Sequence, residues 1–419
     1  MNYKKYEMGP YNLHIIKNDK FKTNAIEIKI KTITKNKEAL YIQLLSDLLI
    51  KSTNKYKNSR QLEIASEELY NAVYSLSSKV SGKYKILDLS ISFLNEKYAD
   101  ENIVEDVFKF IHEILFNPDV HNNAFDENRL NQVKATLKDD LKFNLDIPSF
   151  LGKKKLNNIM NPEILDICDM IDDIDDISGE ELYNYYLELL KRGIVDIFVC
   201  GDVDENKIKE NVTKYIEINT IKRKGVSHYI KQDKFRKRSR SAIIEKDVSQ
   251  SSLNIGYKLN TMTNFEIQYT SYVYNYILGS GMNSLLFKDV REKHSLCYTI
   301  NSTFARLYNI MYVTAGIDSK NYKKTLSLVK KNIKKISEGK FDEKAIEEAK
   351  EFFKAGNLSI LDSQFGIIGR FVSIEYLDQD SFDKRGKEID KVTKEDVMKL
   401  AKKIHLDTIV LVKGSDTSE

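Results

Sequence analysis

The two halves of this 419-residue chain repeat one order of predicted elements, and this repeat limits the possible folds more than any single motif. Setting Tyr74 against Tyr298 aligns YSLSSKVSGKYKILDLSISF with YTINSTFARLYNIMYVTAGI without a gap. Further along each half, DIFVCGD (196–202) matches IVLVKGS (409–415). Because each repeat must bury its own apolar faces, a repeat of this length predicts two homologous domains.

Each half is predicted to have an α+β fold. Alternating apolar residues predict strands, and apolar residues at helical spacing predict helices. The expected order is a hairpin of two strands, a helix, a break, a second helix, two strands, two helices, a terminal helix and a final strand. In the first hairpin, 11–16 and 25–33, we expect the charged residues between Ile26, Ile28 and Ile30 to face water. Each domain should therefore be a mostly antiparallel sheet covered by helices.

The predicted domain boundaries follow the repeat. Residues 1–216 form the first domain, 241–419 form the second, and 217–240 form a basic interdomain linker that is low in aliphatic residues and lacks a helical period. Within the second domain, two glycines weaken any helix over 364–382. Two similar halves joined by a flexible linker are expected to form a clamshell around a chamber, and ligand sites concentrate at such domain interfaces.

Composition argues against several classes of protein. Lys and Arg number 66 and Asp and Glu number 62, so the net charge of +4 is too small to indicate nucleic-acid binding by itself. Only Tyr229 and Phe235 interleave with the basic residues of the linker, whereas stacking on nucleic acid would need more aromatics. The cysteines Cys168, Cys200 and Cys297 have no paired spacing, which indicates a reducing compartment. With no signal peptide and no apolar run of membrane length, we expect a cytoplasmic protein.

Residues 290–299 (VREKHSLCYT) carry the most informative chemistry in the chain. Arg291 begins a short charged turn, and Tyr298 opens a segment that alternates like a strand. A guanidinium fork and a phenolic hydroxyl suit a peptide carbonyl or a developing oxyanion better than they suit a metal ion. The opposing interpretation is that Arg291 pairs with Asp289 or Glu292 on a helix face and that Tyr298 simply starts a strand.

The whole chain, with its repeat, resembles one half-molecule of the pitrilysin and mitochondrial-processing-peptidase family, the inverzincins. The strongest local match is GSGMNSLLFKDVREKHSLCYTINS (279–302), which is similar to the family's second-domain signature of a Gly-rich turn, an S-x-L-F helix and R-E-K-x-x-L-x-Y. LYNAVYS (69–75) and FNP (116–118) add weaker matches. The resemblance implies a fold in which two such halves enclose a peptide, which a zinc-bound water then hydrolyses.

The zinc-binding motif of the family is absent. In members of the family, His-x-x-Glu-His lies on the first long helix of the first domain, where the two His hold zinc and the Glu is the general base. In this chain the two ligand positions are occupied by Gln43 and Asp47, and the base position by Ser46. The family's third ligand, a Glu, would fall near 138–140, where no Glu stands. We therefore expect no metal in this chain and no peptidase activity from the chain alone.

No other residues are expected to replace this site. The six histidines never pair at i and i+4, and the nearest approach, His112-Glu113, is more typical of a packing or surface histidine. The acidic run DICDMIDDIDDI (166–177) lacks the spaced oxygen ligands and the Gly of a calcium loop. Cys297 and His294 are close in sequence, but at the start of a strand their side chains should point in unrelated directions, which argues against a Cys-His nucleophile.

The resemblance implies a role for Arg291 and Tyr298 in another chain's active site, because the matching family residues bind the peptide near the scissile carbonyl. Such a donor is worth about 10²–10³ in rate. Our first hypothesis is a zinc-free subunit of a heterodimeric zinc peptidase, whose homologous partner carries His-x-x-Glu-His and the zinc, as in bacterial members made of two small chains. The second hypothesis is a structural scaffold or peptide-binding clamp without a role in hydrolysis. The third, ranked last, is a nucleic-acid binder that uses the basic linker.

Overall fold

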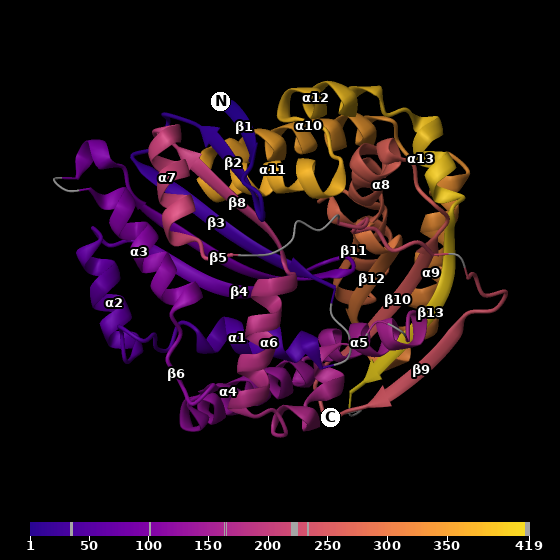
Figure 1. The fold of residues 1–419 in the computed structure, drawn as a ribbon. Coiled ribbons are helices and arrows are strands. Elements are labelled where there is room, and N and C mark those ends of the chain that lie inside the picture. Colours follow the sequence, from indigo (N-terminus) through magenta and orange to yellow (C-terminus); the bar gives the residue numbers. More distant parts are fainter. Residues whose placement is uncertain are drawn as a thin grey trace. The chain divides into compact units, whose positions relative to one another are not determined.

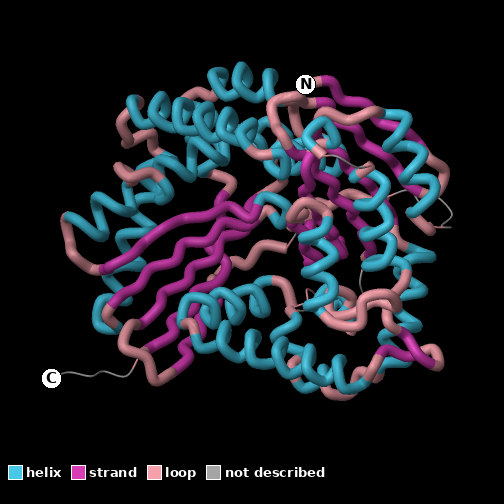
Figure 2. Tube along the Cα trace, turned by 90° about the vertical axis from the view of Figure 1, so that its left-hand side faces the viewer, coloured by secondary structure: helices cyan, strands magenta, loops and turns pink. Residues whose placement is uncertain are grey.

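A computed structural model describes residues 1–33, 37–99, 102–162, 164, 166–218, 225–232 and 234–414 of the chain. It divides into two compact units, and in Figure 2 each shows a sheet of strands, in magenta, against helices, in cyan. Unit 1 comprises Met1–Asp140, Asp169–His228 and Leu361–Val372, and unit 2 comprises Leu141–Cys168, Tyr229–Ile360 and Ser373–Glu419. Each unit thus contains a segment from the opposite half of the chain, which boundaries drawn along the sequence do not express.

The sheet of unit 1 has six strands, in the order β1, β2, β8, β3, β5, β4. Their bounds are β1 Asn2–Glu7, β2 Tyr11–Lys17, β3 Thr23–Thr32, β4 Val73–Ser81, β5 Tyr84–Leu94 and β8 Ile194–Gly201. β8 lies between β2 and β3, parallel to the first and antiparallel to the second. The predicted hairpin of β2 and β3 is therefore wrong. β8 takes the central position because it is apolar on both faces and is buried along almost its whole length.

The predicted water-facing side of β3 is also wrong, because its charged residues are buried. Glu27, Lys29 and Lys31 are 6–7% exposed. The Lys29 ammonium lies 2.6 Å from a carboxylate oxygen of Glu27 and 2.8 Å from one of Asp88. Lys31 pairs with Asp196 on β8 at 3.2 Å. Each buried charge has an opposite charge beside it, as burial requires.

Helices pack on the sheet of unit 1. Figure 1 shows α3 and α7 side by side, and α1 and α6 contact β4, β5 and β3. The bounds are α1 Glu38–Leu48, α2 Ser59–Glu68, α3 Ile103–Phe116, α4 Glu127–Asp146, α6 Gly179–Arg192 and α7 Glu205–Tyr215. Within the described parts of the chain, no helix is both long enough and apolar enough to cross a membrane.

A helix from the second half of the chain completes unit 1. α11 (Gln364–Leu377) forms despite its two glycines, since tertiary contacts override its weak propensity. Ile367 and Ile368 pack against a cluster that includes Ile16 and Phe198 on the sheet. The Gln364 side chain donates hydrogen bonds to the backbone carbonyls of Thr23 and Cys200, at 2.7 and 2.9 Å.

The sheet of unit 2 has five strands, in the order β11, β12, β10, β13, β9. Their bounds are β9 Arg240–Glu245, β10 Ser251–Leu259, β11 Cys297–Ala305, β12 Ile310–Ile317 and β13 Ile404–Lys413. β9 is parallel to β13, as β2 is to β8, and each remaining strand has a counterpart in unit 1. This shared topology confirms the predicted repeat and the α+β class.

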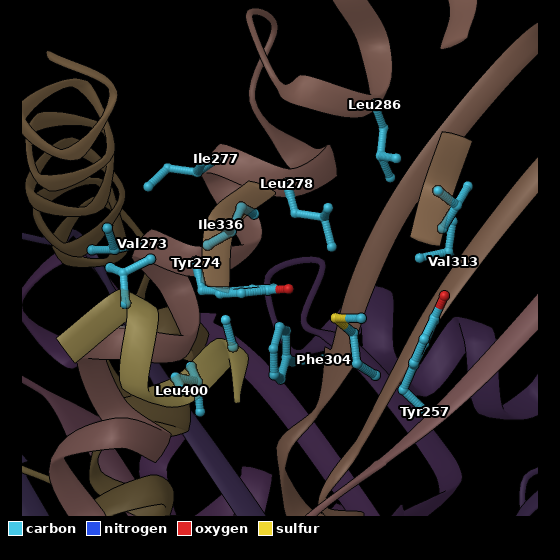
Figure 3. Packing of buried hydrophobic residues seen from close by; sticks show 14 of the residues in the cluster. Tyr257, Val273, Tyr274, Ile277, Leu278, Leu286, Phe304, Val313, Ile336 and Leu400 are labelled. Carbon is cyan, nitrogen blue, oxygen red and sulfur yellow. The ribbon is translucent and has the colours of Figure 1, made fainter. Parts of the chain in front are cut away.

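The core of unit 2 lies between its helices and one face of the sheet. In Figure 3 the ring of Tyr274 meets that of Phe304, with Leu278 and Leu286 close by; the two ring centres are 5.7 Å apart. The helical bounds are α8 Ser271–Asn275, α9 Tyr322–Ser337, α10 Lys344–Ser359, α12 Phe382–Glu388 and α13 Lys394–Ala401. Three π-helical turns, Glu266–Thr270, Tyr276–Ser280 and Phe287–Glu292, interrupt the predicted helices around α8.

A helix from the first half of the chain, α5 (Pro148–Met160), contacts β10 and β13 of unit 2. The approach to β10 is so close that a Cβ on Gly256 would lie 2.3 Å from the Met160 sulfur. Lys258, also on β10, is buried and donates a hydrogen bond to the Met160 carbonyl at 2.8 Å. The helix end thus satisfies its free carbonyl with a lysine of the strand beneath it.

Part of the predicted linker 217–240 is docked rather than extended; its residues 219–224 and 233 lie outside the described residues. In unit 1, the Val226 amide donates to the Tyr84 hydroxyl at 2.7 Å. His228 Nδ1 lies 3.1 Å from the Ser81 carbonyl oxygen. At the turn between β4 and β5, Gly82 has φ +58°, and a Cβ there would overlap the His228 carbonyl oxygen. This turn therefore needs glycine for both its backbone conformation and the contact with the linker.

Candidate functional site

Arg291 lies at the end of a helical segment whose termination sets up the site. The segment Phe287–Glu292 is π-helical, and Ser295 beyond it has φ 48°. The Leu296 amide donates to the Val290 carbonyl and the Ser295 amide to the Arg291 carbonyl, both at 3.1 Å. These nested bonds are like those of a Schellman motif, but each spans one residue more, as fits the wider turn of the π-helical segment before them. The motif reverses the chain, so β11 begins beside the end of the helix.

Tyr298 is presented by a β-bulge at the start of β11, the edge strand of the sheet. Cys297 pairs with Ile317, whereas Thr299 pairs with Gly316, so Tyr298 has no partner residue on β12. Its side chain is 74% exposed. A bulge re-aims the side chain of the extra residue. The sequence indicated the start of a strand here but gave no signal of the bulge.

The structure brings the two predicted residues together. The guanidinium carbon of Arg291 lies 4.8 Å from the ring centre of Phe287 and 5.9 Å from that of Tyr298. Both distances are within the range of cation–π contacts. The guanidinium therefore lies near both rings, contacts that do not use its N–H donors.

The interpretation of Arg291 as part of a helix-face ion pair is wrong. Asp289 instead accepts hydrogen bonds from Lys335 Nζ and Asn332 Nδ2, both at 3.0 Å. Burial raises the pKa of Asp289, but these two donors and the charge of Lys335 leave it below its usual value. Among the described residues, no carboxylate oxygen lies within 4.0 Å of the Arg291 guanidinium. Its donors remain available to a ligand.

A polar pocket of about 1050 Å³ opens beside Tyr298. Its walls come from the ends of β10, β11, β12 and β13, and its side chains include those of Gln250, Asp318, Asn321 and Lys413. No local sequence pattern predicts this pocket, because the residues of its walls are far apart in the chain. The glycine at position 316 reflects the close packing of the pocket wall, because a Cβ there would lie 2.8 Å from a side-chain oxygen of Gln250.

Cys297 and His294 do not form a nucleophile pair. Burial raises the pKa of the Cys297 thiol to about 11, although the charge of Arg291 acts in the opposite direction. His294 Nδ1 is instead 2.7 Å from the backbone oxygen of Asp289. A thiol with a raised pKa carries little thiolate at neutral pH, so its reactivity is low.

The residues predicted to occupy the family's zinc positions lie on α1 in unit 1 and bond to one another. Gln43 Nε2 donates to Asp47 Oδ2 at 3.2 Å, and Ser46 Oγ donates to the Gln43 carbonyl at 2.7 Å. Ser46 is completely buried. Burial raises the pKa of Asp47, and the nearby charge of Asp140 raises it further. Asp140 belongs to the segment 138–140 in which the third ligand was expected.

These residues do not fit a zinc ion. Zinc in this family needs two imidazoles and a carboxylate, whereas α1 offers one amide and one carboxylate that already bond to each other. Across the described ranges, no group of three or more His, Cys, Asp and Glu side chains could hold a metal ion. The acidic run 166–177 forms two short 3-10 turns, with Ile174 and Ile177 buried.

Comparison with known proteins finds relatives in sequence and, separately, solved structures with the same fold. Residues 176–353 match the family model described as the Peptidase M16 inactive domain. Over 427 aligned residues the chain is 27% identical to the probable inactive metalloprotease YmfF of Bacillus subtilis (strain 168), covering 99% of each protein.

Two solved structures share the fold. A conserved protein from Enterococcus faecalis V583 superimposes with a TM-score of 0.94 at 24% identity, over 100% of both chains. A peptidase M16 inactive domain from Pseudomonas fluorescens superimposes with a TM-score of 0.79 at 16% identity, again over 100% of both chains. With its repeated fold and without the zinc-binding motif, the chain is similar to inactive, metalloprotease-like members of the M16 peptidase family.

Proposed function

We propose that this chain is the zinc-free subunit of a heterodimeric zinc peptidase, and that it supplies Arg291 and Tyr298 to the active site of its partner. The partner would be a homologous chain with His-x-x-Glu-His and the zinc ion. The observation that carries the proposal is the state of Arg291. It has no carboxylate within 4.0 Å among the described residues and lies beside a tyrosine that a bulge exposes.

The arrangement of donors suits a peptide carbonyl whose oxygen gains negative charge. The Arg291 guanidinium is fixed against Phe287, so little side-chain freedom is lost when it binds. Tyr298 can donate its hydroxyl proton to the same ligand. Donors already positioned around a developing oxyanion need no reorganisation during the reaction, which is why they are worth about 10²–10³ in rate.

The substrate we propose is a peptide, and the polar pocket beside Tyr298 supports this class. A pocket of about 1050 Å³ with hydroxyl, amide and charged groups can hold several residues of a hydrophilic chain better than one apolar side chain. We further propose a cytoplasmic location, which is supported by three free cysteines, of which Cys168 and Cys200 are buried.

The test is a peptide-hydrolysis assay on the chain purified together with its His-x-x-Glu-His homologue. We expect Arg291→Ala and Tyr298→Phe to lower the kcat of the complex by about 10²-fold each, without loss of assembly. Arg240→Ala and Tyr98→Phe are the matched controls, because both residues are exposed and lie outside the site. Unchanged rates in both site variants would reject the role in hydrolysis and favour the structural scaffold or peptide-binding clamp.

A further inference from the structure

We propose that Arg306 and Arg385 of unit 2 form a binding site for an oxyanion, a phosphate or a carboxylate group. Arg306 lies in the turn between β11 and β12, and Arg385 lies on α12. The proposal does not depend on the function proposed above, because neither residue belongs to the Arg291 and Tyr298 site.

The two arginines share one aromatic wall. The guanidinium carbon of Arg306 lies 3.6 Å from the ring centre of Tyr272, and that of Arg385 lies 6.0 Å from the same ring. Arg385 is also 4.7 Å from the ring centre of Phe353. Tyr272, Phe353 and Arg385 come from the neighbouring helices α8, α10 and α12, which Figure 1 shows side by side. These distances are within the range of cation–π contacts, which hold a guanidinium near a ring without using its N–H donors.

Most of the N–H donors of this pair have no acceptor. Arg306 Nε donates to the Ser271 hydroxyl at 2.8 Å, and no described residue accepts from its two terminal amino groups. Arg385 is only 6% exposed, and its Nε is buried without a hydrogen-bond partner. Leaving donors unpaired in a buried place is costly, whereas an oxyanion would supply several acceptor oxygens at once.

The charge of the pair is not balanced by an ion pair. Among the residues that the structure describes, no carboxylate oxygen lies within 4.0 Å of either guanidinium. The charge of Arg385 acts on Asp380, whose carboxylate already accepts hydrogen bonds from Tyr269 at 2.6 Å and Lys384 at 2.7 Å. Burial lowers the pKa of Arg306, and the like charge of Arg385 lowers it further.

An anion bound between the two arginines would accept hydrogen bonds from their unpaired N–H groups and would offset their positive charge. Two guanidinium forks give several parallel N–H groups, which match the oxygens of a phosphate or a carboxylate. The packing that surrounds Arg385 limits the ligand to a small anion or to the charged end of a larger molecule.

The test is isothermal titration calorimetry of the full-length protein with inorganic phosphate and, separately, with acetate at matched ionic strength. We expect saturable binding of one anion per chain. Arg306→Gln should weaken it about tenfold or more, and Arg306→Lys should weaken it less, because lysine keeps the charge without the fork. Tighter binding of phosphate would identify a phosphate ligand, and tighter binding of acetate a carboxylate.

Arg240→Gln is the matched control, since Arg240 is an exposed arginine of the same unit and should bind as the unmodified protein does. If Arg306→Gln does not fold, Arg385→Lys and Arg306→Lys decide the matter by the same comparison. Failure of both anions to saturate, or equal affinity in the Arg306 variants and the unmodified protein, would overturn the proposal and leave the pair as packing against aromatic rings.

Discussion

The two sets of residues predicted to occupy the family's active-site positions differ in whether their polar groups already have hydrogen-bond partners. On α1, Gln43 bonds to Asp47, and Ser46 is buried with its hydroxyl on the helix backbone. At the start of β11, Tyr298 is 74% exposed and lies beside Arg291. The polar groups on α1 bond within the helix, whereas the donors of Arg291 and Tyr298 have no acceptor among the described residues. Loss of zinc at one position therefore does not mean that every position has lost its use.

The largest effect should follow from forcing the family's general base back into α1. Ser46→Glu places a carboxylate where the present side chain is 0% exposed, so we expect the free energy of unfolding to fall by about 3–5 kcal/mol. Ser46→Ala is the control and should cost about 1 kcal/mol or less, since it removes only one hydrogen bond. Chemical denaturation measures both. A Ser46→Glu protein as stable as the unmodified one would show that α1 still has room for the base.

Acid should weaken unit 1 through the docked part of the linker. Burial lowers the pKa of His228 to about 4, from 6.5 for a free histidine. As the pH falls below 6.5, the unfolded chain takes up a proton that the folded protein takes up only near pH 4, so the folded state loses stability across this window. Between about pH 7.5 and about pH 5 the loss should be about 2 kcal/mol.

Urea denaturation at the two pH values measures this loss of stability, with His228→Gln as the comparison. Glutamine cannot take up the proton, so the variant should lose about 2 kcal/mol less than the unmodified protein over the same range. An identical pH dependence in both proteins would mean that His228 titrates normally and that its environment is wetter than the structure shows.

The sequence predicted the repeat correctly because the final strands and the β4–β5 and β11–β12 pairs carry alternating patterns that survive in both halves. The predictions from sequence were wrong where pairing or burial depends on segments that are far apart in the chain. β8 separates β2 from β3, and Lys29 is buried because it pairs with Glu27 on its own strand and with Asp88, far along the chain, on β5. The proximity of Arg291 and Tyr298 followed from a motif, but the bulge and the pocket depend on strand pairing that no local pattern shows.

A moderate gain in stability is expected at the helix end that positions Arg291. Ser295 has φ 48°, a left-handed conformation that costs a residue with a side chain roughly 1–2 kcal/mol. Ser295→Gly should therefore raise the free energy of unfolding by about 1 kcal/mol, less the entropy that glycine gains in the unfolded chain. Thermal unfolding measures the change, and Ser319→Gly, in a turn without a left-handed residue, is the control. A loss of stability at Ser295 would show that its side chain contributes more than its backbone costs.

The smallest effect on stability should come from Arg291→Ala, and this sharpens the contrast with α1. Arg291 forms no ion pair among the described residues and its contacts are with two rings at the surface, so we expect a change within about 0.5 kcal/mol. Denaturation of the isolated chain measures this, while the kcat of the partnered complex measures the role in hydrolysis. A large drop in kcat at unchanged stability separates a residue kept for a ligand from one kept for the fold. A stability loss of several kcal/mol would instead make Arg291 a packing residue, and any fall in rate would then follow from damage to unit 2.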